Sequence, residues 1–255
     1  MFDVCLSKAK GMLVEMSVKS FIKKPIKNIY QRFFGNVDEV LWAQVFHDAI
    51  IGSEWLTDKK FYPGRAAVGY EFLYVLFRVL SSTRPKSILE LGLGQTTHMI
   101  SQYVSANLGA RHIVVEHDPL WIDFFLKEHR ISDRTKIMQM DLGKTDFRGT
   151  SVTSYERFSE NLAGSRFDFI CIDGPFGFDA KKYSRIDTLE LMPRCLESSF
   201  VIMIDDYNRQ AEQNTVKELT ALLSRNNIDT YGGSYRGRKT SHLIATSDYK
   251  FLCTL

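Results

Sequence analysis

Three aspartates stand where two short apolar runs of the chain end. Asp173 follows the run Phe-Asp-Phe-Ile-Cys-Ile, and Asp205 and Asp206 follow the run Phe-Val-Ile-Met-Ile. If these runs are neighbouring parallel strands, their carboxyl ends share one crevice and the three carboxylates converge there. Oxygen-rich clusters bind Mg²⁺ or Ca²⁺, so one hypothesis is a divalent-metal site. The alternative is structural: Asp205 and Asp206 cap the next helix or pair with Arg209.

A glycine turn is the second stretch that could do chemistry. Residues 87–91 form a short apolar run, Gly92 and Gly94 follow it, and the sequence from Thr96 onward is typical of a helix start. A strand, a glycine turn and a helix N-terminus in this order leave free backbone N–H groups at the end of a parallel sheet. This stretch therefore predicts a nucleotide-binding site.

Two glutamates near the turn narrow the choice of nucleotide. Glu116 ends the next apolar run, 24 positions after Gly92, where an acid can accept hydrogen bonds from ribose hydroxyls. The alternative for Glu116 is an ordinary surface acid at a strand end. Sites for NAD favour a third glycine, and Thr97 occupies that position here. Glu90, just before the turn, also argues against NAD.

The arrangement Glu-x-Gly-x-Gly resembles motif I of the class I S-adenosylmethionine (SAM) methyltransferases, in which an acid precedes a Gly-x-Gly-x-Gly turn. Thr96 replaces the third glycine of that motif. The resemblance implies that SAM is the cofactor, bound by the glycine turn and Thr96. It also implies that Glu90 meets the methionine amino end, that Glu116 holds the ribose, and that Asp141 binds the adenine amino group.

The three aspartates also match a family pattern. In catechol-type O-methyltransferases, an aspartate after the fourth strand and an Asp-Asn pair after the fifth hold a divalent ion, and Asp173, Asp205 and Asp206 match these positions with Asp in place of Asn. The resemblance implies a metal, Mg²⁺ for example, that orients a hydroxyl and lowers its pKa. Asp173 or Asp206 is then the catalytic base or a metal ligand.

Residues 88–215 are distantly similar to the glucuronoxylan 4-O-methyltransferase family of polysaccharide biosynthesis. Four motifs carry this similarity: Gly-Leu-Gly at 92–94, Glu-His-Asp-Pro-Leu-Trp-Ile at 116–122, Ile-Asp-Gly-Pro-Phe-Gly at 172–177 and Asp-Tyr-Asn-Arg-Gln-Ala-Glu at 206–212. It implies methylation of a sugar hydroxyl, for instance on an acidic sugar of a surface polysaccharide. Tyr207, Arg185 and Arg209 are the substrate-binding candidates, since Arg binds carboxylates well. The alternative for both arginines is a structural or surface ion pair.

Short apolar runs that alternate with segments of helical periodicity must position these residues. This alternation predicts an α/β fold with a doubly wound, mostly parallel, Rossmann-like sheet. A late pair of strands around three glycines predicts an antiparallel C-terminal edge. The expected strands are 87–91, 112–116, 135–139, 167–172, 200–204, 228–231 and 242–245. The expected helices are 40–51, 66–81, 97–108, 119–129, 153–162, 184–196 and 211–224. Residues 1–82 form a helical extension or lid, and residues 83–255 form the SAM-binding domain.

The N-terminal segment differs in charge from the rest of the chain. Residues 1–34 hold seven Lys and Arg against two acids, whereas the whole chain carries a net charge of +3. Ile22, Ile26 and Ile29 recur at helical spacing, which predicts either a basic amphipathic helix on an anionic membrane surface or a helix packed on the main domain. The mild overall charge does not indicate nucleic acid as a partner.

Four scattered cysteines without a Cys-x-x-Cys pair favour a reducing compartment, so we expect a cytoplasmic protein, with peripheral membrane contact through residues 1–34 as an option. Two other functions stay open at this point. One is an NAD-linked oxidoreductase, and the other is a non-catalytic subunit that keeps the fold and docks on a membrane-associated assembly.

Overall fold

A computed structural model describes residues 36–64 and 67–255. Within them, a central sheet of seven strands has the order β3-β2-β1-β6-β7-β9-β8. The strands are β1 (Ser87–Leu91), β2 (Arg111–Glu116), β3 (Thr135–Gln139), β6 (Phe167–Ile172), β7 (Leu196–Ile204), β8 (Tyr231–Arg236) and β9 (Thr240–Ala245). The first five strands in this order run parallel, and β9 and β8 add an antiparallel edge. The predicted Rossmann-like sheet is therefore confirmed.

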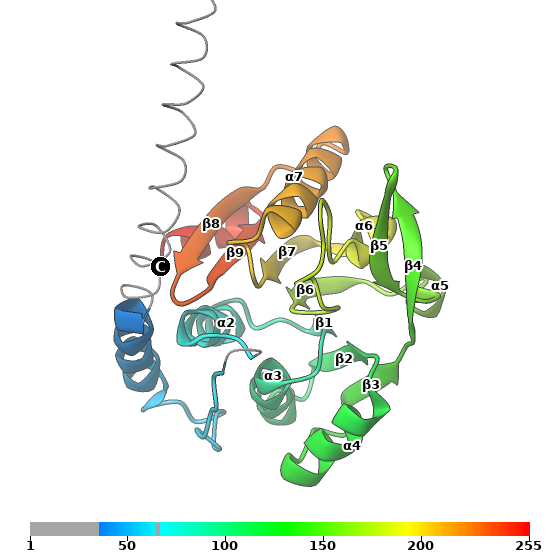
Figure 1. Ribbon diagram of the computed structural model, residues 1–255. Coiled ribbons are helices and arrows are strands. Elements are labelled where there is room, and N and C mark those ends of the chain that lie inside the picture. Colours follow the sequence, from blue (N-terminus) through cyan, green and yellow to red (C-terminus); the bar gives the residue numbers. More distant parts are fainter. Residues whose placement is uncertain (1–35, 65–66) are drawn as a thin grey trace, which may run out of the picture.

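Helices cover both faces of the sheet (Figure 1). On one face lie a helix over residues 36–50, α2 (Tyr70–Thr83), α3 (Gln95–Ala106) and α4 (Pro119–Glu128). On the other face lie α5 (Phe158–Asn161), α6 (Asp187–Leu191) and α7 (Gln210–Arg225). A 3₁₀ helix, η1 (Ser247–Thr254), follows the last strand. Cover on both sides explains why the strands are apolar almost without interruption.

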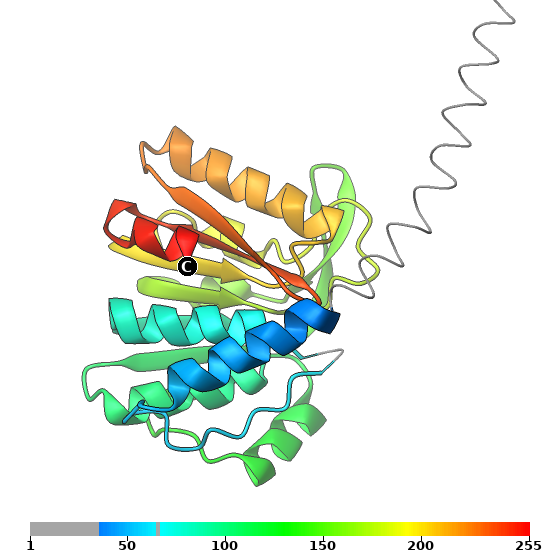
Figure 2. The same cartoon turned by 90° about the vertical axis from the view of Figure 1, so that its left-hand side faces the viewer.

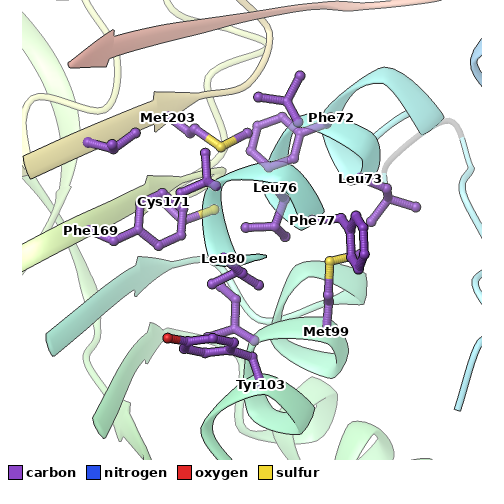
Figure 3. Packing of buried hydrophobic residues seen from close by; sticks show 14 of the residues in the cluster. Phe72, Leu73, Leu76, Phe77, Leu80, Met99, Tyr103, Phe169, Cys171 and Met203 are labelled. Atoms are coloured by element: carbon purple, nitrogen blue, oxygen red, sulfur yellow. The ribbon is translucent and has the colours of Figure 1, made fainter. Parts of the chain in front are cut away.

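The larger core cluster lies between α2, α3 and the sheet (Figure 3). Phe72 and Leu76 of α2 are fully buried in the same cluster as Phe169 and Met203 of the sheet and Met99 of α3. α2, which lies within residues 1–82, the predicted helical extension, therefore packs directly on the sheet.

The helix over residues 36–50 lies across the outer side of α2 (Figure 2). Phe46 is fully buried, and the Trp42 ring centroid lies 5.5 Å from that of Tyr74 in α2. The Trp42 indole N–H also donates to the Arg236 carbonyl, 2.8 Å away at the end of β8. These contacts fix the helix to both α2 and the antiparallel edge of the sheet.

The predicted helix over residues 153–162 is wrong. The chain forms a β-hairpin of β4 (Leu142–Phe147) and β5 (Thr150–Tyr155), and only α5 follows as a short helix. Arg148 and Gly149 both have positive φ, 53° and 71°, which is the conformation that a two-residue hairpin turn requires.

Two further elements differ from the sequence prediction. The expected helix at 184–196 is only the five residues of α6. The strand expected at 228–231 lies later in the chain: β8 begins at Tyr231 and runs through Gly232 and Gly233 to Arg236. A Cβ at Gly233 would collide with the backbone of Cys253 in η1, so glycine permits the strand to pack closely there.

The prediction of a basic amphipathic helix at residues 1–34 lies outside the described residues. In the part of the chain that the structure describes, no helix is both long and apolar enough to span a bilayer.

Candidate active site

A cavity of about 770 Å³ lies at the carboxyl ends of β1, β2 and β6. The lining residues are Asp58, Lys60, Tyr62, Ala67, Val68, residues 92–96, residues 116–118, Trp121, Phe124, Phe125, Glu128, His129, Tyr155 and residues 173–176. The cavity therefore joins the predicted cofactor turn to Asp173, the first of the three predicted acids. This is the crevice in which open α/β sheets bind their ligands.

The two glycines of the turn do different things. Gly92 has φ +95°, and a Cβ there would lie 3.1 Å from the Gly174 nitrogen and 3.2 Å from the Asp173 carbonyl carbon. Gly92 therefore permits the close approach of the β1 and β6 ends. Gly94 has an extended φ of −179°, and among the described residues nothing lies within 4 Å of a Cβ built on it. Its backbone is left open toward the cavity that it lines.

The helix after the turn begins with a hydroxyl contact. The Gly94 N–H donates to the Thr97 hydroxyl at 3.0 Å, which satisfies one backbone donor at the start of α3. Thr96 lines the cavity and is 2% exposed. Trp121 of α4 supports the turn from the other side, because its indole N–H donates to the Leu93 carbonyl at 2.7 Å.

Glu116 ends β2 and lines the cavity, as expected of a ribose ligand. Its Oε2 accepts from the Leu93 N–H at 3.0 Å, and its Oε1 accepts from the His117 and Asp118 N–H groups at 2.7 and 3.0 Å. The His117 Nδ1 also lies 2.7 Å from Oε1, so Oε1 already has three partners. Oε2 has only the Leu93 N–H, and a carboxylate oxygen accepts about two hydrogen bonds, so roughly one position on Oε2 remains for a ligand hydroxyl. The carboxylate thus connects the glycine turn to the β2–α4 junction.

Glu90 and Asp141 do not line the cavity. Glu90 points to the α2–α3 side of β1, where it is fully buried and its Oε2 lies 3.0 Å from the His112 Nε2. Asp141 follows β3 with its side chain exposed. The roles predicted for these two residues, at the methionine amino group and the adenine, stay predictions.

The structure brings the three aspartates together. One oxygen from each of Asp173, Asp205 and Asp206 lies within 4.8 Å of the others. The convergence expected from the strand ends is therefore present. Asp173 lines the cavity with its side chain 19% exposed, whereas Asp205 and Asp206 lie behind it and are buried.

Cations meet this cluster from three elements. The Arg185 Nη2 lies 2.8 Å from Asp206 and 3.3 Å from Asp173. Arg209 Nη1 lies 3.0 Å from Asp206, and Lys239 Nζ lies 2.8 Å from Asp205. The alternative noted above, an ion pair between Asp206 and Arg209, is thus present.

Two pKa shifts follow from this packing. Burial and the neighbouring charge of Asp205 raise the pKa of Asp173 well above its usual value, although Arg185 and Lys239 oppose the shift. For Lys239, burial would lower the pKa, but Asp205 and Asp173 outweigh it and raise the pKa. The protonated ammonium of Lys239 is therefore the favoured form.

The predicted substrate-binding residues lie beside the cavity, outside its lining. Arg185 is 4% exposed, and its guanidinium binds the carboxylates of Asp206 and Asp173. Arg209 also lies 3.5 Å from Glu212 and keeps a 34% exposed side chain. Tyr207 stacks on His242, with ring centroids 4.3 Å apart.

Sequence reasoning missed Lys239 and Tyr155. Lys239 lies in the turn between β8 and β9, and antiparallel pairing of β9 with β7 brings that turn to the end of β7, where Asp205 stands. Tyr155 ends β5 and lines the cavity, with its hydroxyl beside Gly174. The sequence signals the β4–β5 and β8–β9 hairpins by the glycines in their turns, Gly149 and Gly237. Which part of the site each hairpin approaches is visible only in the fold.

No protein-family model matches the chain, and no curated protein matches it. Solved structures do. A putative O-methyltransferase from Klebsiella pneumoniae matches with a TM-score of 0.53 and 13% identity over 84% of this chain and 99% of that one. The O-methyltransferase TomG from Streptomyces achromogenes, involved in tomaymycin synthesis and solved with SAM, matches with a TM-score of 0.52 and 13% identity over 85% of this chain and 98% of that one.

At these identities the likeness shows the fold. The chain shares the Rossmann-like fold of the solved O-methyltransferases, with an antiparallel edge on a mostly parallel sheet. The similarity to the glucuronoxylan 4-O-methyltransferase family stays a prediction.

Proposed function

We propose that this chain is a SAM-dependent O-methyltransferase. One observation carries the proposal: a single cavity is lined by the glycine turn and Glu116 on one side and by Asp173 on the other. The shared fold with solved O-methyltransferases supports it. A cofactor at the turn would have its transferable group near the end of β6, where Asp173 stands.

The residues present fit SAM in three respects. The open backbone at Gly94 leaves room for a ligand against the start of α3. Glu116 keeps an acceptor position for a ribose hydroxyl. Asp58, Asp118, Glu128 and other acids outnumber the lysine in the described lining, which suits the net positive charge of SAM.

Asp173 is the group we assign to the acceptor. Bound SAM supplies a methyl group that its sulfonium already activates, so the protein must align the acceptor and take a proton. Asp173 is the member of the acid cluster that reaches the cavity, and it would receive the proton of the acceptor hydroxyl. Asp206, the other predicted base, is enclosed by cations and acts through its pairing with Arg185.

A sugar hydroxyl of a cell-surface polysaccharide is the acceptor that we propose. Aromatic rings of Tyr62, Trp121, Phe124 and Phe176 line the cavity and remain partly exposed, so they offer flat surfaces to the C–H face of a sugar ring. Lys60 lines the same cavity, and it could pair with the carboxylate of an acidic sugar.

The free thiols of Cys171, Cys195 and Cys253 suit the reducing cytoplasm, where we expect the reaction.

The test is transfer of radiolabelled methyl from SAM to polysaccharide isolated from cells that lack this protein. We expect label in the sugar fraction with the full chain, and at least a hundredfold less with Asp173→Asn. Binding of S-adenosylhomocysteine by this variant should stay within about threefold of the parent. Near-parental turnover of Asp173→Asn would reject Asp173 as the base, and label in another acceptor class would reject the sugar.

A further inference from the structure

The Arg185 guanidinium lies among the carboxylate and carbonyl oxygens at the ends of β6 and β7. The Arg185 Nη1 donates to the Asp205 carbonyl at 2.9 Å and to the Ile172 carbonyl at 3.4 Å. Its Nη2 donates to Asp206 Oδ2 at 2.8 Å and to Asp173 Oδ1 at 3.3 Å. Two carboxylates and two strand-end carbonyls thus face one buried cation, and these are the ligand types that a divalent ion would need.

A second cation enters from the antiparallel edge. Lys239 Nζ lies 2.8 Å from Asp205 Oδ2 and 3.6 Å from Asp206 Oδ1, and its side chain is only 12% exposed. A Gly237 N–H donates to the Lys239 carbonyl at 2.9 Å and closes the turn that holds it. The ammonium therefore reaches the cluster from the β9 side of β7, whereas Asp173 follows β6 on the other side of β7.

Cations already contact every carboxylate of the cluster. Arg185 contacts Asp173 and Asp206, Lys239 contacts Asp205, and Arg209 contacts Asp206 and is shared with Glu212. A divalent ion bound to the same oxygens would have to displace Arg185 or lie against its positive charge. Buried like charges at such distances repel strongly.

The backbone also indicates that the Arg185–Asp206 pair is built into the fold. Arg185 and Asp206 have φ of 53° and 60°, and neither residue is glycine. The left-handed region is unfavourable for such residues and persists where surrounding contacts dictate it. Here each residue of the strained pair contacts the other at 2.8 Å.

We propose that Arg185 and Lys239 take the place of the divalent cation, so that the site is metal-independent and these two residues position Asp173 toward the cavity. The residues of this chain thus do not fit the metal that the catechol-type pattern implies. The experiments that measure turnover rest on the proposed function. The metal-binding experiment does not, because it needs neither cofactor nor acceptor.

The first experiment measures Mn²⁺ binding by the full chain, free of cofactor, from the electron paramagnetic resonance signal of the free ion. Equimolar protein, each at about 0.2 mM, should leave the free signal unchanged. Uptake of one Mn²⁺ per chain that Asp205→Asn abolishes would overturn the proposal. This arm gives a result even if no acceptor is ever found, so its failure is distinct from failure of the proposed function.

The second experiment measures SAM-dependent turnover after treatment with a chelator. We expect kcat to stay within about twofold, with no response to added Mg²⁺. Activity that the chelator removes and Mg²⁺ restores would contradict the proposal.

The third experiment separates positioning from mere stability. Lys239→Met should lower kcat at least tenfold with little change in KM for SAM, while Lys239→Arg keeps most of kcat because it restores the charge. Lys217→Met, which removes an exposed lysine of α7, is the matched control and should behave as the parent. A folded Lys239→Met variant with parental kcat would rule out the role of Lys239.

Discussion

A methyl group added at Gly92 should lower the stability of the fold, whereas one added at Gly94 should mainly weaken cofactor binding. Gly92→Ala places a residue with a Cβ at φ +95°, 3.1 Å from the Gly174 nitrogen. The left-handed conformation costs about 1–2 kcal/mol, and the contact with backbone that cannot move aside adds to it. We therefore expect Gly92→Ala to lower the free energy of unfolding by about 2–3 kcal/mol.

Gly94→Ala should cost less stability than Gly92→Ala and should weaken cofactor binding. The φ of −179° suits any residue, and the described residues leave the space around the new Cβ empty. Gly94 is the N-cap residue of α3, where alanine is less favourable than glycine, so the free energy of unfolding should fall by no more than about 1 kcal/mol. Since Gly94 lines the cavity, its methyl group would enter space that the cofactor needs, and affinity should fall at least tenfold, or about 1.4 kcal/mol.

Urea unfolding and calorimetric titration with S-adenosylhomocysteine measure the two quantities for each variant. The reasoning is refuted if Gly94→Ala binds with parental affinity, because the turn would then not hold the cofactor. Equal stability of Gly92→Ala and the parent would refute the assigned contact between the β1 and β6 ends.

Two other substitutions test the site and its support. Glu116→Gln should weaken S-adenosylhomocysteine binding by about 10- to 100-fold in calorimetry. The reason is that an amide cannot accept from all three backbone N–H groups and also from a ribose hydroxyl. Parental affinity of this variant would show that Glu116 does not bind the cofactor. Burial, with Asp205 and Glu39 adding to it, raises the pKa of Glu71 from 4.5 to about 8. Protonated Glu71 therefore stabilises the fold. Its contribution to the free energy of unfolding is fully present below about pH 4.5 and is lost as the pH rises through about 8. Glu71→Gln should therefore be more stable than the parent by a few kcal/mol at pH 9, with little difference at pH 4.5, and parallel urea-unfolding curves across this range would contradict the assignment.

Much of the sheet could be predicted from the sequence. The strands at residues 87–91, 135–139 and 167–172 have the bounds that the sequence predicts. Residues 87–91 and 167–172 are mostly apolar runs between turn or helix signals. The β4–β5 hairpin could not be separated from a helix in this way, since its sequence has few apolar residues to set a period. Its turn at residues 148–149 was the available signal.

The site was predicted in part for the same reason. Acids that end parallel strands must lie at one edge, so the convergence of Asp173 with Asp205 and Asp206 follows from the strand pattern alone. The cations around them could not be predicted, because Lys239 arrives through the antiparallel pairing of distant segments. Likewise, alternation along β1 places Glu90 on the same face as Ile88, but the fold is needed to see that this face meets α2 and α3, where His112 lies beside Glu90.

The most direct test of the account is calorimetric titration of the full chain with S-adenosylhomocysteine and, separately, with NAD. The account predicts one saturable site for S-adenosylhomocysteine that Gly94→Ala weakens at least tenfold, and no saturable heat with NAD. Saturation by NAD with no response to S-adenosylhomocysteine would contradict it, because the cavity between Gly94, Glu116 and Asp173 would then serve a different cofactor.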